Sequence, residues 1–133
     1  MNNYSYSEIK TCIIKWYKEL LLNFEDKYKF FISKNKKDVL IIDFEFPECL
    51  AQLTVNNSDY LPYKYVYFES LSLNTGRQIY CFFDDETTRK RDVITSLNNA
   101  FKFCEMYSTN KVESYSCDKK NLSHMVLQGR SDL

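Results

Sequence analysis

Two acidic residues in an apolar stretch are the first candidates for chemistry. Asp43 and Glu45 are two positions apart within residues 39–45, so a strand would present both carboxylates on one face, where they could bind a metal ion. A metal-dependent nuclease needs further acidic ligands at matching places, and only Asp132 follows the single histidine, His124. Alternating acids on the solvent face of a half-buried strand are the simpler interpretation, and we keep a nuclease as the third functional hypothesis.

Two other groups have residue types that suit a site but lack the spacing that a site requires. Asp84, Asp85 and Glu86 are consecutive and carry the oxygen ligands that Mg²⁺ and Ca²⁺ prefer, but the spacing of a calcium-binding loop is missing. Acidic residues just before a helix also stabilise its positive end, which is the interpretation that we favour. Cys117 and His124 would supply a thiol and a base, without a third group to orient them. We therefore predict no catalytic residue and no bound metal.

The residue composition favours a binding surface over an active site. Two Gly and one His among 133 residues leave little for a phosphate-binding turn or for proton transfer near neutral pH. Eleven Tyr and ten Phe instead provide large amphipathic rings, which suit contacts with another macromolecule. We expect a protein that is not an enzyme and needs no cofactor.

Charge and cysteine usage limit the partners and the compartment. Lys+Arg and Asp+Glu both number 18, and the resulting net charge of zero argues against a nucleic-acid partner. No apolar run has the length of a membrane span, and residues 1–7 lack the pattern of a signal peptide. The five cysteines are odd in number and never spaced as Cys-x-x-Cys, so we expect reduced thiols, with Cys12, Cys81 and Cys104 as small buried hydrophobes. We predict a cytoplasmic protein with no membrane partner.

Helical periodicity is strong near the start of the chain. Ser5 and Glu8 have the spacing of a capping box, in which the hydroxyl and the carboxylate each satisfy a free backbone amide of the first turn. Apolar residues then recur at intervals of three and four, and they predict an amphipathic helix over residues 7–26. The expected apolar stripe consists of Ile9, Cys12, Ile13, Trp16, Leu20 and Phe24.

Strand-forming residues dominate the middle of the chain. β-Branched and aromatic residues are concentrated in five segments, and polar turn residues separate them. The segments are residues 28–33, 39–46, 50–55, 64–73 and 78–84. The sequence Asn74-Thr75-Gly76 predicts a hairpin, because Gly accepts the positive φ of such turns. Short connections join antiparallel neighbours, so we predict a four- to five-stranded meander.

A second helix is expected after the strands. Thr87 or Thr88 would cap it, and it should end near Tyr107. Its apolar stripe would consist of Val93, Leu97, Ala100, Phe101 and Cys104. One face of the sheet is the natural place for both helical stripes. We therefore predict an α+β fold in which an antiparallel meander is flanked by an N-terminal and a C-terminal helix, with a single domain at 1–107 and a partly ordered tail at 108–133.

Two segments of this arrangement, together with the second helix, resemble a known class of proteins. Residues 59–69, residues 82–86 and the helix after them are similar to small immunity proteins of bacterial polymorphic toxin systems, including those of contact-dependent growth inhibition. The resemblance implies a cytoplasmic protein that binds a cognate toxin domain, often a nuclease. It implies inhibition by covering the active site or the substrate path of the toxin, without chemistry.

Acidic and aromatic residues would make such a contact. Carboxylates steer association with a basic cleft, and aromatic side chains at the rim anchor the complex. The predicted toxin-binding residues are Asp43, Glu45, Glu48, Asp59, Tyr60, Tyr63, Asp84, Asp85 and Glu86. The alternative hypothesis is a small chaperone or adaptor that dimerises and binds a protein client. The sequence leaves open whether the protein is a monomer or a homodimer.

Overall fold

An amphipathic helix opens the described part of the chain, and it begins at the predicted capping box. The computed structural model describes residues 4–57 and 62–109 of the 133-residue chain. Helix α1 spans Tyr6–Phe24; the Glu8 N–H donates to Ser5 Oγ at 3.0 Å, and the Ser5 N–H donates to Glu8 Oε1 at 2.9 Å. The predicted stripe residues Cys12 and Phe24 are only partly buried. The fully formed stripe consists of Ile9, Ile13, Trp16, Tyr17 and Leu20.

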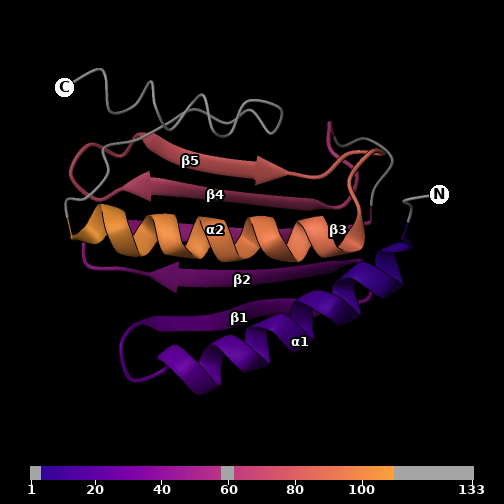
Figure 1. Cartoon of the computed structure of the whole chain (residues 1–133), viewed down its shortest axis with the longest axis horizontal. Coiled ribbons are helices and arrows are strands. Elements are labelled where there is room, and N and C mark those ends of the chain that lie inside the picture. Colours follow the sequence, from indigo (N-terminus) through magenta and orange to yellow (C-terminus); the bar gives the residue numbers. More distant parts are fainter. Residues whose placement is uncertain (1–3, 58–61, 110–133) are drawn as a thin grey trace.

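Five antiparallel strands follow among the described residues and confirm the predicted meander. They are β1 (Lys29–Lys36), β2 (Val39–Glu45), β3 (Cys49–Asn56), β4 (Val66–Ser72) and β5 (Gln78–Phe83). Each strand pairs with its neighbour in sequence, so the order across the sheet is β1-β2-β3-β4-β5 (Figure 1). The predicted hairpin joins β4 to β5, and Gly76 within it has a φ of +71°, which residues with a side chain rarely adopt.

The second helix starts later than the sequence indicates. Helix α2 spans Lys90–Ser108, and its N-cap residue, Arg89, makes no side-chain capping bond to the described residues. The predicted cap at Thr87 or Thr88 is wrong, because both hydroxyls serve a turn before the helix. Thr88 Oγ1 accepts from the Asp85 N–H at 3.0 Å, and Thr87 Oγ1 donates to Asp85 Oδ1 at 2.6 Å. The end of the helix agrees with the prediction.

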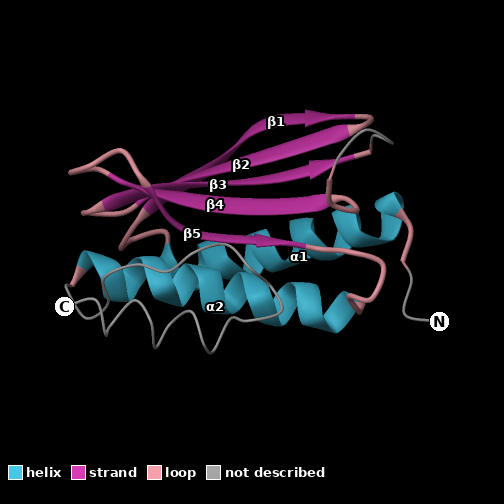
Figure 2. Ribbon diagram, turned by 90° about the horizontal axis from the view of Figure 1, so that it is seen from above, coloured by secondary structure: helices cyan, strands magenta, loops and turns pink. Residues whose placement is uncertain are grey.

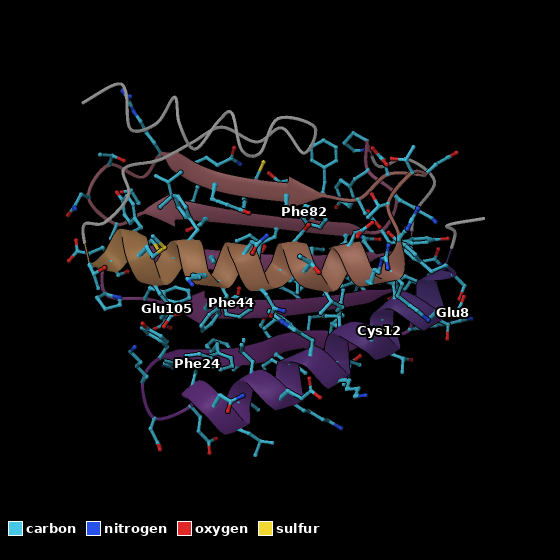
Figure 3. The ribbon with its side chains drawn as sticks, in the orientation of Figure 1. Glu8, Cys12, Phe24, Phe44, Phe82 and Glu105 are labelled. Atoms are coloured by element: carbon cyan, nitrogen blue, oxygen red, sulfur yellow. The ribbon has the colours of Figure 1, made fainter. Side chains whose placement is uncertain are left out.

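Both described helices pack against the same face of the sheet, so the domain has two layers (Figure 2). The core between the layers is rich in aromatic rings. The Phe101 ring lies 4.9 Å from that of Phe24 and 6.2 Å from that of Phe44, measured between centroids. Phe24 of α1 and Phe44 of β2 are labelled in Figure 3. The Trp16 indole N–H donates to Asn98 Oδ1 at 2.7 Å and links α1 to α2. The fold is therefore α+β, with a five-stranded antiparallel meander between an N-terminal and a C-terminal helix in the chain order.

Two further sequence predictions concern the membrane and the tail. Neither of the two described helices combines the length and the apolarity that crossing a membrane requires. The expected short apolar element in the tail lies outside the described residues, which end at position 109. The division at residue 107 therefore stays a prediction.

Candidate protein-binding face

The sheet face opposite the helices carries no described helix, and its residues follow from the strand register (Figure 2). Antiparallel partners point to the same face of a sheet, so the pairings arrange side chains of successive strands in rows. Three such rows make up a surface that we call the open face. The rows are Lys29, Glu45, Leu50, Leu71 and Gln78; Phe31, Asp43, Gln52, Glu69 and Cys81; and Lys34, Ile41, Thr54, Tyr67 and Phe83.

Large apolar side chains on the open face are in contact with solvent. Phe31, Leu50 and Leu71 expose 39%, 43% and 37% of their surface, respectively. Residues on the helix-covered face of the same strands, such as Leu40 and Leu53, are completely buried. Exposed apolar side chains grouped on a regular sheet, with polar residues among them, are typical of a surface that binds another macromolecule.

Three carboxylates lie among these apolar side chains. They belong to Asp43, Glu45 and Glu69. Gln52 Nε2 donates to Asp43 Oδ1 at 2.8 Å, which orients this carboxylate without neutralising it. Glu45 lies 3.9 Å from Lys29 Nζ, and an exposed ion pair of this kind contributes at most about 1 kcal/mol. Lys29 and Lys34 belong to the same rows, so the open face carries charges of both signs beside its apolar anchors.

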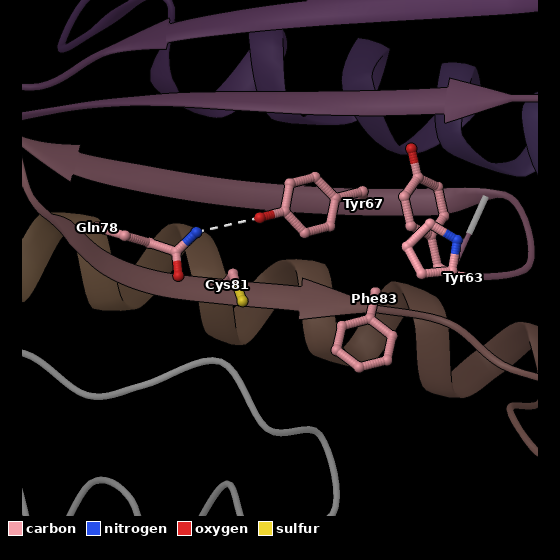
Figure 4. Close-up of a pocket in the computed structure, with 6 residues that line it drawn as sticks. Tyr63, Tyr67, Gln78, Cys81 and Phe83 are labelled. Atoms are coloured by element: carbon pink, nitrogen blue, oxygen red, sulfur yellow. Dashed lines mark hydrogen bonds between the residues drawn. The ribbon is translucent and has the colours of Figure 1, made fainter.

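A pocket of about 320 Å³ lies at the β4–β5 end of the open face (Figure 4). The rings of Tyr63 and Tyr67 stack with centroids 5.4 Å apart and planes 20° apart. Gln78 Nε2 donates to the Tyr67 hydroxyl at 3.0 Å. Burial is the main reason that the pKa of each tyrosine is raised, so both phenols stay neutral near pH 7. The described residues that line the pocket are Pro62, Tyr63, Tyr67, Gln78, Cys81 and Phe83.

The structure brings some of the predicted binding residues together and separates others. Asp43 and Glu45 lie on the open face, and Tyr63 lines its pocket. Glu48 lies in the connection between β2 and β3, where its Oε1 accepts from Asn74 Nδ2 at 3.3 Å. This contact joins two turns at one end of the sheet, so Glu48 borders the open face instead of lying within it.

Of four more predicted residues, two are not described and two lie in the turn between β5 and α2. Asp59 and Tyr60 fall outside the described residues. Asp85 accepts from the Thr87 N–H at 2.8 Å, and it therefore organises the turn between β5 and α2. Glu86 is exposed in the same turn. The acidic run is thus split between different environments, although its members are consecutive in the sequence.

Asp84 is a structural residue inside the domain. It is completely buried, and its Oδ1 accepts from the backbone N–H groups of Tyr65 and Val66, both at 2.8 Å. Its Oδ2 accepts from the Tyr4 hydroxyl at 2.6 Å. Burial first, and this hydrogen bond second, raise the pKa of Tyr4 well above its ordinary value. Because Asp84 joins the N-terminal segment to the start of β4 and has no exposed surface, we do not include it in the open face.

The metal and nucleophile hypotheses gain little from the described residues. Asp43 and Glu45 do share one face, as their spacing predicts. Within residues 4–57 and 62–109, however, no group of three or more His, Cys, Asp or Glu side chains is arranged to hold a metal ion. Cys117 and His124 lie outside the described residues. The paired acids are therefore the one feature here that a nuclease would use.

The cysteines differ in their chemical state. Cys12, Cys49 and Cys104 are free thiols, and the last two are buried. The Cys104 thiol donates to Ser70 Oγ at 3.5 Å, and burial raises its pKa. Cys81 is buried as predicted, but it is disulfide-bonded, so the expectation that all five cysteines are reduced is wrong.

Comparisons with known protein families, with curated protein sequences and with solved structures found no match to this chain. The functional argument therefore depends on the open face and its pocket. The resemblance of residues 59–69 and 82–86 to immunity proteins supplies the hypothesis about the partner.

Several residues of the open face were not singled out from the sequence. They are exposed or half-buried strand residues whose neighbours in sequence are buried or partly buried: Phe31, Leu50, Tyr67, Glu69 and Leu71. The alternation of buried and exposed positions in β3 is a signal that could have found Leu50. Their grouping, in contrast, depends on the register of five strands, which the local pattern does not determine.

Proposed function

We propose that this protein is an immunity protein that binds a cognate bacterial toxin domain in the cytoplasm and neutralises it by covering its active site or substrate path. The observation that carries the binding part of the proposal is the open face, on which exposed apolar side chains and carboxylates lie together on a rigid sheet. The choice of a toxin as the partner comes from the sequence resemblance. The cytoplasmic location is the expectation from the sequence, which the resemblance also implies.

The carboxylates of the open face suit a basic partner. A nuclease binds a polyanion and therefore presents a positively charged cleft. The carboxylates would speed the encounter with such a cleft, whereas desolvation of the apolar anchors would slow dissociation. The carboxylates are those of Asp43, Glu45 and Glu69, and the anchors are Phe31, Leu50 and Leu71.

Co-expression tests this function. The protein would be produced together with the toxin domain encoded immediately upstream of its gene, and growth and co-elution at gel filtration would both be measured. We expect restored growth and a complex of one copy of each protein. If growth is not restored and no complex elutes, the toxin hypothesis is wrong.

A dimeric adaptor is the second candidate, because Phe31, Leu50 and Leu71 would also fit an apolar surface of a second copy. A two-fold interface places the same patch on both subunits. Sedimentation equilibrium of the isolated protein distinguishes the two candidates, since an adaptor would be a stable dimer without any partner.

A further inference from the structure

A carboxylate without a cationic partner lies beside the aromatic pocket of the open face. Glu69 is on β4, two residues after Tyr67, and its side chain is half-buried. Within residues 4–57 and 62–109, no ion pair involves Glu69, and its hydrogen bonds use only Oε1. We propose that this pocket binds the guanidinium side chain of an arginine that a protein partner presents. The inference rests on the proposed function, since it names the chemistry that a toxin domain would bring to this end of the open face.

Hydrogen bonds hold the Glu69 carboxylate at the side of the pocket. Glu69 Oε1 accepts from Gln78 Nε2 at 3.0 Å and from the Tyr67 hydroxyl at 3.3 Å. Gln78 Nε2 also donates to the Tyr67 hydroxyl, so the three side chains form one network (Figure 4). Tyr67 and Gln78 both line the pocket, and the network leaves Glu69 Oε2 and the Gln78 amide oxygen as acceptors. A guanidinium has five N–H donors in one plane, which suits a carboxylate next to an amide oxygen.

The walls of the pocket match the flat faces of a guanidinium. The rings of Tyr63 and Tyr67 lie nearly parallel, and Phe83 is opposite Tyr67 on the neighbouring strand (Figure 4). A guanidinium is weakly hydrated and stacks on aromatic rings, whereas the ammonium group of lysine is compact and strongly hydrated. The volume of about 320 Å³ is at the lower end of the range for ligand pockets, so it suits one long side chain. The pocket therefore favours arginine over lysine.

The charge beside the pocket is negative, although the open face as a whole carries both signs. Burial is the main reason that the pKa of Tyr67 is raised, and the negative charge of Glu69 is the second. Lys29 and Lys34 are on β1, at the opposite edge of the five-stranded sheet from β5. A cation that reaches the β4–β5 end of the open face is therefore attracted by Glu69, and these two lysines are too far away to compete.

Titration of the full-length protein with N-acetyl-arginine amide tests the pocket without any toxin. We expect saturable changes in the NMR signals of the Gln78 side-chain amide and the Phe83 backbone amide, with a dissociation constant that is roughly millimolar. The citrulline derivative has nearly the same shape but no charge, so it should bind at least about fivefold more weakly. The lysine and leucine derivatives should also bind more weakly. Unchanged signals, or equal binding of any of these three derivatives, would overturn the proposal.

Two matched variants test the role of the carboxylate. Glu69→Gln keeps an acceptor oxygen for Tyr67 and Gln78 but removes the charge, and the affinity for N-acetyl-arginine amide should fall about fivefold. Glu45→Gln makes the same change on β2, which two strands separate from β5, and it should bind this probe as the wild type does. Equal affinity of the two variants would show that Glu69 does not bind the guanidinium.

Calorimetry with the upstream toxin domain distinguishes this inference from the proposed function. We expect Glu69→Gln to bind the toxin at least about tenfold more weakly than the wild type, and Glu19→Gln, an exposed position on α1, to bind it equally well. A toxin that binds Glu69→Gln as tightly as the wild type would overturn the arginine site and leave the immunity function standing. If no toxin binds at all, the proposed function is wrong, and the titration with N-acetyl-arginine amide decides the site on its own.

Discussion

Removal of the Asp84 carboxylate should destabilise the domain strongly, although the residue is acidic and lies next to a turn. In Asp84→Ala, three donors lose their hydrogen-bond acceptor. The Tyr4 hydroxyl and the Val66 N–H are buried, and the Tyr65 N–H is partly buried. Each buried group left unpaired costs about 1–3 kcal/mol, so the free energy of unfolding should fall by roughly 3–4 kcal/mol. With a urea m value of about 2 kcal/mol/M, the midpoint should move down by roughly 1.5–2 M.

Two companion variants make this measurement decisive. Asp84→Asn keeps an oxygen for both backbone donors, so its loss should be smaller, at about 1–2 kcal/mol. Asp43→Ala removes a carboxylate whose one described hydrogen bond, from Gln52, is exposed to solvent. The free energy of unfolding of this variant should stay within about 0.5 kcal/mol of the wild-type value. The reasoning is refuted if Asp84→Ala unfolds at the same urea concentration as Asp43→Ala.

Three further predictions concern local features and pH. Gly76→Ala should lower stability to urea by about 1 kcal/mol because of the positive φ, and an unchanged midpoint would contradict this reason. Hydrogen bonds with Ser5 hold the pKa of Glu8 below 4.5, so the ionised carboxylate stabilises the fold above that pH. The difference in the free energy of unfolding between the wild type and Glu8→Gln should therefore become smaller as the pH falls below 4.5. A difference that does not change with pH would contradict this prediction. Burial and the hydrogen bond to Glu105 raise the pKa of Tyr28 from 10.0 to about 12. The neutral phenol therefore stabilises the fold, and this contribution is lost as the pH rises from 10 to about 12. Over this range the free energy of unfolding should fall more for the wild type than for Tyr28→Phe.

The sequence predicted those parts of the fold that local patterns determine. The Ser5–Glu8 capping box, the hairpin at Gly76 and the strand segments all depend on residues close together in the chain. The N-cap of α2 was predicted wrongly for a local reason too. Thr88 was available as a cap, but the Asp85 N–H uses its hydroxyl first, and the helix starts after that turn is closed.

Long-range contacts account for what the sequence did not predict. Asp84 has its hydroxyl partner, Tyr4, 80 positions away, and no local signal distinguishes this buried carboxylate from its exposed neighbour Glu86. The open face likewise depends on a register that aligns Leu50 with Leu71 across two strands. The sequence therefore identified Asp43 and Glu45 as a pair on one face but could not place the apolar side chains around them.

The most direct test of the binding role is the affinity of the upstream toxin domain for two matched variants, measured by titration calorimetry. Asp43→Lys with Leu50→Lys changes the open face, whereas Glu19→Lys with Leu22→Lys makes the same changes on exposed positions of α1. We expect the dissociation constant to rise at least roughly a hundredfold for the open-face variant and to stay close to the wild-type value for the helix variant. Unchanged binding by the open-face variant, with both variants folded, would contradict the account.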